Sequence, residues 1–115
     1  MIREAETDAL ATACEDWELV TSELSRVEVV HAVKVARPEP ERIAEVERLL
    51  QSVDLISIST AVLRRAAAVA SSELRSPDAI HLATAERVET SEIVTYDRRL
   101  ADAAKQVGLH VLAPT

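Results

Sequence analysis

Two spacings of apolar residues alternate along the chain. In some segments apolar residues recur every three or four positions, which is the spacing of one helix face, and in shorter segments they alternate or run together as in strands. The pattern predicts helices over 3–14, 22–36, 40–53, 59–74, 76–88 and 98–108, and strands over 17–22, 54–59, 92–97 and 109–114.

This order of elements predicts an α/β fold, because strands that alternate with helices form a mainly parallel sheet. No repeat or long linker divides residues 1–115, so we expect a single domain. One feature departs from the usual alternation. The first predicted element is a helix, with no room for a strand before Ile2.

Several helix ends carry local signals. Ser59 or Thr60 can cap the helix that follows them. Ser76 is in position to act as an N-cap, with Pro77 at the first helical position, where a missing N–H costs nothing. Gly108 closes the last helix.

Composition and charge limit the possible functions. The apolar fraction of 48% indicates a globular chain, and no apolar run approaches the roughly 20 residues needed to span a bilayer. The single cysteine, Cys14, excludes an internal disulfide and fits a buried side chain in a reducing, cytoplasmic compartment. The net charge of −7 argues against a general nucleic-acid coat. It does not exclude an enzyme that handles phosphates through a metal ion.

Three acids stand at positions where a solvated charge is not the expected choice. Glu28 falls on a helix that is apolar nearly all round, so its carboxylate should face a polar pocket or a cation, unless it reaches solvent or a neighbouring base. Asp78 follows Ser-Pro, and Asp97 lies between a strand and a helix. Taken by itself, each of these two is better explained as a residue that starts a helix.

Taken together, the three acids indicate a different chemistry. Adjacent carboxylates repel one another unless a cation joins them, and hard oxygen ligands suit Mg²⁺ or Mn²⁺. Other sites find no support in the sequence: it has no zinc spacing, no glycine-rich phosphate loop and no nucleophile elbow. His31 and His81 fit packed or surface positions better than ligand positions.

Three segments follow one another in the order "LVTSELSRVEVVHAV", "SPDAIHLATA" and "IVTYDRRLADAAKQVGLHVLAP". In this order they resemble the PIN-domain family, and within it the VapC branch, the toxin ribonucleases of toxin–antitoxin pairs. The similarity extends over nearly the whole chain. It implies a three-layer α/β fold in which helices flank a mainly parallel central sheet.

The resemblance also implies a set of site residues. Carried over onto the matching positions, Glu28, Asp78 and Asp97 are the catalytic and metal-binding acids. Ser22 and Thr95 lie near this set in the family and are weaker candidates for supporting it. The implied activity is endonucleolytic cleavage of RNA with Mg²⁺ or Mn²⁺, in which a metal-bound water attacks phosphorus.

Partners are implied in the same way. The family's toxins are neutralised by a small cognate antitoxin protein that places an Arg in the acidic site, which fits the negative charge of this chain. The family also tends to form homodimers. The expected partners are therefore an antitoxin, an RNA substrate and a second copy of the chain, with no membrane.

The chain departs from the family at its start. The family begins with a strand that carries an Asp and lies centrally in the sheet, and this segment has no counterpart here. Asp8 lies too far downstream to replace that acid. Without the strand, the sheet is expected to separate into two halves with unpaired edges. We hypothesise that the chain is a shortened PIN domain, which arises either from a misassigned start codon or as a degraded paralogue. The intact mass of the native protein distinguishes these two origins.

The shortened form leaves an alternative function open. A PIN-like module that lacks the first acid could be catalytically impaired and bind an antitoxin or RNA without cleaving. Upstream DNA that encodes a strand ending in Asp, in frame with Met1, favours the enzyme. A stop codon there favours the binding module.

Overall fold

A computed structural model describes residues 20–36 and 38–113. The predicted helix over 3–14, with Asp8 and Cys14, lies outside these residues. The elements, in chain order, are β1 (Val20–Ser22), α2 (Leu24–Ala36), α3 (Pro40–Gln51), β2 (Asp54–Ile56), α4 (Thr60–Val69), α5 (Ser76–Arg87), β3 (Glu92–Val94), α6 (Arg98–Gln106) and β4 (His110–Leu112). The alternation of helices and strands is therefore as the sequence predicts.

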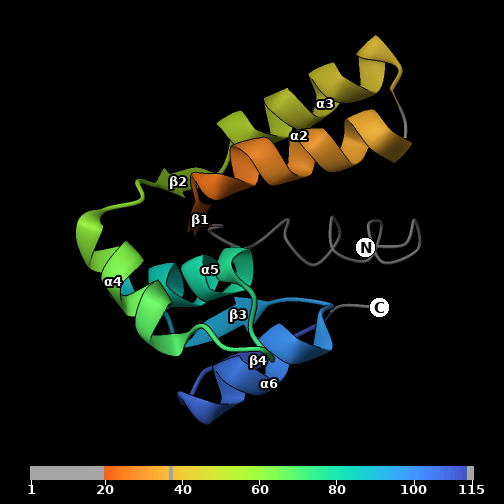
Figure 1. Cartoon of the computed structure of the whole chain (residues 1–115). Coiled ribbons are helices and arrows are strands. Elements are labelled where there is room, and N and C mark those ends of the chain that lie inside the picture. The colour runs from red at the N-terminus through yellow and green to blue at the C-terminus, as the bar shows by residue number, and fades with distance from the viewer. Residues whose placement is uncertain (1–19, 37, 114–115) are drawn as a thin grey trace.

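The described strands form two separate sheets (Figure 1). Strand β1 pairs with β2 in parallel, and β3 pairs with β4 in parallel. Each strand has three residues, fewer than the alternating pattern suggests. The parallel pairing confirms the α/β class, and the separation agrees with the two sheet halves predicted from the sequence.

Helix α5 lies at the centre of the packing. It contacts α4, α6 and strand β1, so it touches both halves of the structure. Its residues Ala79, Leu82 and Ala83 share one face and are at most 2% exposed, and Thr84 and Ala85, which point to other sides, are 4% and 9% exposed. The helix is therefore covered on several sides. The main core is formed by Val62, Ala66, Leu74, Ala79, Leu82, Ala83, Leu100 and Ala104. Among the described residues, every buried apolar side chain except Leu50 belongs to this core or to α5 itself.

The α2–α3 hairpin extends away from this core (Figure 1). Its two helices pack on each other, and Leu50 is its one buried apolar side chain among the described residues. Val27 and Val35 of α2 are 68% and 72% exposed. Within residues 20–36 and 38–113, no helix is both long and apolar enough to cross a membrane.

Two helix ends follow their sequence signals. The Ser59 side chain accepts a hydrogen bond from the backbone N–H of Val62, 3.2 Å away, and caps α4 as predicted. Gly108 has φ +89°, a conformation that a residue with a Cβ adopts only with strain. This turn lets the Leu109 N–H bond to the Ala104 carbonyl at 2.9 Å, which ends α6.

The predicted end of α4 was wrong. The expected helix over 59–74 stops at Val69. Beyond it, the Ser71 hydroxyl accepts a hydrogen bond from the Leu74 N–H at 3.2 Å. Serine side chains compete in this way with the helical hydrogen bonds of the backbone. The resulting turn directs Leu74 into the core, where it is 4% exposed.

The buried position of α5 predicts a large cost for cutting back its central side chain. Replacing Leu82, which is 1% exposed, with Ala should lower the unfolding free energy by about 2–5 kcal/mol. Leu63 on α4 is 48% exposed, so the same substitution there should change it by less than about 0.5 kcal/mol. Urea unfolding of both variants measures the difference. Equal effects would contradict the described packing of α5.

Candidate active site

A cavity of about 380 Å³ lies where the start of α5 meets the loop between β3 and α6. Asp78 and Asp97 line it, together with three arginines. Asp97 follows the carboxyl end of β3, the edge at which ligands gather in parallel α/β folds. The structure thus brings two of the three sequence-predicted acids into one cavity.

Asp78 stands in the first turn of α5. The helix begins at Ser76 with Arg75 as its N-cap, so the predicted capping by Ser76 was wrong by one residue. The cause is the first helical hydrogen bond, which runs from the Ala79 N–H to the Arg75 carbonyl at 2.9 Å. Asp78 remains in the first turn, where the helix dipole favours an acid.

The electrostatic surroundings of Asp78 link the three acids. Burial raises the pKa of the Asp78 carboxyl above its ordinary value, and the negative charge of Asp97 raises it further. Glu28 acts in the same direction, whereas His81 and Arg75 lower this pKa. Charges from α2, α5 and the loop before α6 therefore act on one carboxyl group.

Glu28 reaches α5 from α2. Its Oε1 atom lies 2.5 Å from Nε2 of His81, a short hydrogen bond between two partly buried side chains. From the sequence, Glu28 was expected to face a polar pocket or a cation, unless it reached solvent or a nearby base, and His81 was expected to be packed or at the surface. What the sequence did not show is this pairing. The only available signal was that His81 lies about one turn after Asp78 on α5.

Asp97 has a clear structural role. Its Oδ1 atom accepts a hydrogen bond from the Leu100 N–H at 2.9 Å and so caps α6. Its own N–H donates to Oγ1 of Thr95 at 3.0 Å. The interpretation of Asp97 as a helix cap is confirmed, and the cap fixes the direction of this carboxylate at the cavity.

The two weaker candidates differ in their positions. Thr95 holds the loop that carries Asp97, through the hydrogen bond described above. Ser22 is 1% exposed, and its hydroxyl accepts from the Leu24 N–H at 3.2 Å at the start of α2. Thr95 therefore supports an acid of the cavity directly, while Ser22 supports the helix that carries Glu28.

The donor chemistry of the acids fits a hard divalent cation. Carboxylate oxygens are the ligands that Mg²⁺ and Mn²⁺ prefer, and a cation would offset the negative charges of Asp97 and Glu28, which add to the effect of burial on the pKa of Asp78. In the part of the chain that the structure describes, however, no group of three or more His, Cys, Asp or Glu side chains is arranged to hold a metal ion. Glu28 is engaged with His81 instead.

Comparison with known sequences identifies relatives that match nearly the whole chain. The family profile of the PIN domain matches residues 2–106. Ribonuclease VapC46 of Mycobacterium tuberculosis (strain H37Rv) is 41% identical over 117 residues, covering 99% of this chain and 88% of that protein. Ribonuclease VapC35 of the CDC 1551 strain is 38% identical over 120 residues, covering 96% of this chain and 86% of that protein.

A solved structure has a similar fold. A chain in a toxin–antitoxin complex from Klebsiella pneumoniae matches with a TM-score of 0.71 and 24% identity, covering 98% of this chain and 87% of that chain. The likeness shows a shared fold, in agreement with the parallel strands and flanking helices described above. The chain therefore belongs to the PIN-domain family, in its VapC-type branch.

Proposed function

We propose that the chain is the toxin of a type II toxin–antitoxin system and an endoribonuclease that cleaves RNA phosphodiester bonds with Mg²⁺ or Mn²⁺. The observation that carries this proposal is the shared cavity of Asp78 and Asp97. Its support comes from curated relatives that are ribonucleases and match nearly the whole chain. The negative charge of Glu28 contributes to the raised pKa of Asp78, so this third acid also acts on the cavity.

In this proposal, Asp78 and Asp97 hold the cation, and Glu28 completes the acidic set. The bound cation would supply an activated water and offset the charge that develops on the phosphate. Each acid is oriented by a different feature. Asp78 is oriented by the first turn of α5, Asp97 by its cap on α6, and Glu28 by its hydrogen bond to His81. The chain's part in the reaction is thus to place three carboxylates from separate elements.

The proposed partners follow from the same site. The Klebsiella neighbour is a toxin–antitoxin complex, which supports a cognate antitoxin for this chain. A guanidinium group of that antitoxin would find an acidic partner in Asp78 or Asp97. With one cysteine, the chain suits action in the cytoplasm. A homodimer belongs to the proposal as well, and the exposed valines of α2 offer it an apolar face.

A second candidate function has a specific observation in its favour. Glu28 is bound to His81, and the described acids form no ready three-ligand cluster. A module that binds an antitoxin or RNA without cleaving it would keep the cavity and need no such cluster. Cleavage assays on the purified chain, with and without Mg²⁺, separate the two functions.

The enzyme proposal predicts the effect of neutralising single acids. Glu28→Gln and Asp78→Asn should each reduce Mg²⁺-dependent RNA cleavage by a factor on the order of 100 or more, because each removes a charge that the cation needs. Asp102→Asn removes an exposed acid of α6 and should leave cleavage unchanged. Gel assays of cleavage, with circular dichroism to check folding, measure these effects. Unchanged cleavage by both site variants would refute the assignment of the acids.

Two substitutions at Asp97 separate its structural role from its chemical one. Asparagine caps a helix as well as aspartate does, so Asp97→Asn should keep the melting temperature and lose cleavage. Asp97→Ala should lose cleavage and also about 1 kcal/mol of unfolding free energy, because the Leu100 N–H loses its partner. Thermal unfolding and cleavage assays test both. Full cleavage by Asp97→Asn would show that Asp97 only caps α6 and has no role in the reaction.

The raised pKa of Asp78 predicts a pH-dependent effect on stability. Above the ordinary pKa of 3.8, the folded metal-free protein holds this proton more tightly than the unfolded chain, so stability falls as pH rises through the folded pKa. Asp78→Asn should therefore melt at a higher temperature than the native sequence at pH 7 without metal. The gap should close as pH falls towards 4.

Added magnesium should act in the opposite direction on the difference between the two melting temperatures. Added Mg²⁺ should raise the melting temperature of the native sequence more than that of Asp78→Asn, since the cation stabilises only a folded site that binds it. Scanning calorimetry over pH, with EDTA or Mg²⁺, provides the measurement. A variant that melts below the native protein in EDTA at pH 7 would contradict the electrostatic account of Asp78.

A further inference from the structure

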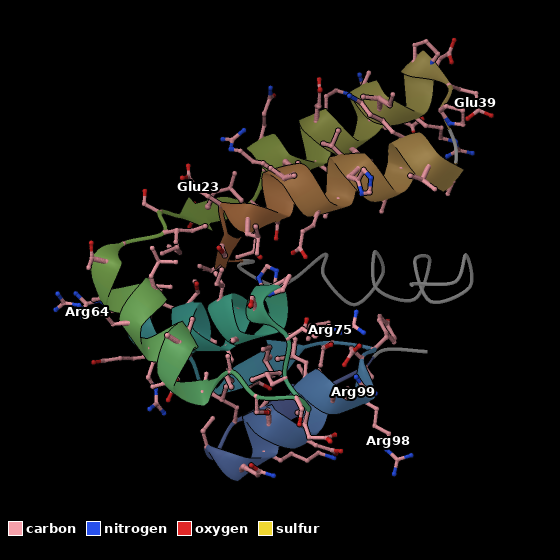
Figure 2. The ribbon with its side chains drawn as sticks, in the orientation of Figure 1. Glu23, Glu39, Arg64, Arg75, Arg98 and Arg99 are labelled. Atoms are coloured by element: carbon pink, nitrogen blue, oxygen red, sulfur yellow. The ribbon has the colours of Figure 1, made fainter. Side chains whose placement is uncertain are left out.

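Three arginines surround the acidic cavity. Arg75 precedes α5, and Arg98 and Arg99 form the first turn of α6. All three are exposed. Figure 2 shows them on one side of the molecule, whereas Arg64 of α4 lies on the other side. In a chain with a net charge of −7, this is a local concentration of positive charge beside two aspartates.

The fold does not account for these arginines. Arg98 and Arg99 occupy the first two positions of α6, where the positive end of the helix dipole disfavours a cation. Arg75 is the N-cap of α5 but gives no side-chain capping bond. Among residues 20–36 and 38–113, the ion pairs involve other side chains. Arg98 and Arg99 therefore cost a little stability or leave it unchanged, and Arg75 contributes to the fold only the attraction of its charge to Asp78.

Their position suits a polyanion that must approach carboxylates. Asp78 and Asp97 alone would repel a phosphate, so a phosphodiester chain needs positive charge at the mouth of the cavity. Guanidinium groups bind phosphate oxygens through paired, charge-assisted hydrogen bonds. Because Arg75 and the α6 pair come from separate elements, they can contact different phosphates of one strand.

We propose that Arg75, Arg98 and Arg99 form a phosphate-binding rim that holds the RNA backbone next to the bond to be cleaved. The rim rests on the proposed function, since it takes RNA as the ligand. It deepens that function by naming the groups that bind the substrate, as distinct from the acids that act on it. Its contribution is electrostatic and independent of base sequence.

The test measures RNA binding without cleavage. A fluorescent single-stranded RNA is titrated with the full chain in EDTA at several KCl concentrations, and anisotropy gives the affinity. Arg75→Gln, Arg98→Gln and Arg99→Gln should each weaken binding several-fold at low salt. Each should also reduce the slope of log affinity against log salt by about 0.7, the value for one phosphate contact on a single strand.

A matched control and a stability readout accompany the test. Arg64→Gln removes the same charge on the far side of the molecule and should change neither affinity nor slope (Figure 2). The melting temperatures of Arg98→Gln and Arg99→Gln should stay constant or rise slightly, because α6 loses cations from its N-terminus. A lower melting temperature of both α6 variants would indicate a structural role for Arg98 and Arg99 and would overturn the rim.

The remaining outcomes separate the rim from the proposed activity. Rim variants that bind like the native sequence overturn the rim, as does an equal loss with Arg64→Gln or no RNA binding by the native chain. Arginine-dependent binding without cleavage in Mg²⁺ supports the rim and refutes the enzyme. Cleavage by the native chain that all three rim variants retain in full refutes the rim and leaves the enzyme standing.

Discussion

The packing of α5 against α4, α6 and β1 sets the position of every acid in the candidate site. Asp78 is part of α5, and Asp97 caps a helix that packs on it. Glu28 reaches α5 from the α2–α3 hairpin through His81. Small side chains permit this close approach, since Ala79 is fully buried and Ala83 is 2% exposed. Alanines make up half of the main core around this helix.

The charges of the acids disfavour this arrangement in the absence of metal, and the same charges suit it to binding a cation. Burial raises the pKa of Asp78, and the negative charges of Asp97 and Glu28 raise it further, so a charged Asp78 is electrostatically unfavourable in the metal-free site. In the proposed function a hard cation would offset that repulsion, and in the proposed rim the nearby arginines would attract a phosphate to the cavity. Without metal, the hydrogen bond between Glu28 and His81 holds the third acid at α5. The two proposals thus assign binding of the cation and binding of the substrate to different residues of one cavity.

Local signals allowed much of the structure to be predicted. The periods of apolar residues gave the order of elements, and short motifs gave the caps by Ser59 and Asp97, because both depend on neighbours in sequence. The end of α4 was missed because the hydroxyl of Ser71 outweighs a run of helix-forming residues. The pairing of Glu28 with His81, and the gathering of Arg75 with the start of α6, join distant segments. Such contacts follow from tertiary packing, which no local pattern encodes.

The most direct test of the central claim is the binding of Mn²⁺ to the purified chain, followed by the electron paramagnetic resonance signal of the free ion. The account predicts binding by the native sequence, and loss of that binding in both Asp78→Asn and Asp97→Asn. Asp102→Asn should bind as the native sequence does, because that acid lies outside the cavity. Native chain that binds no Mn²⁺ at millimolar concentration, or Asp78→Asn that binds it unchanged, would contradict the account.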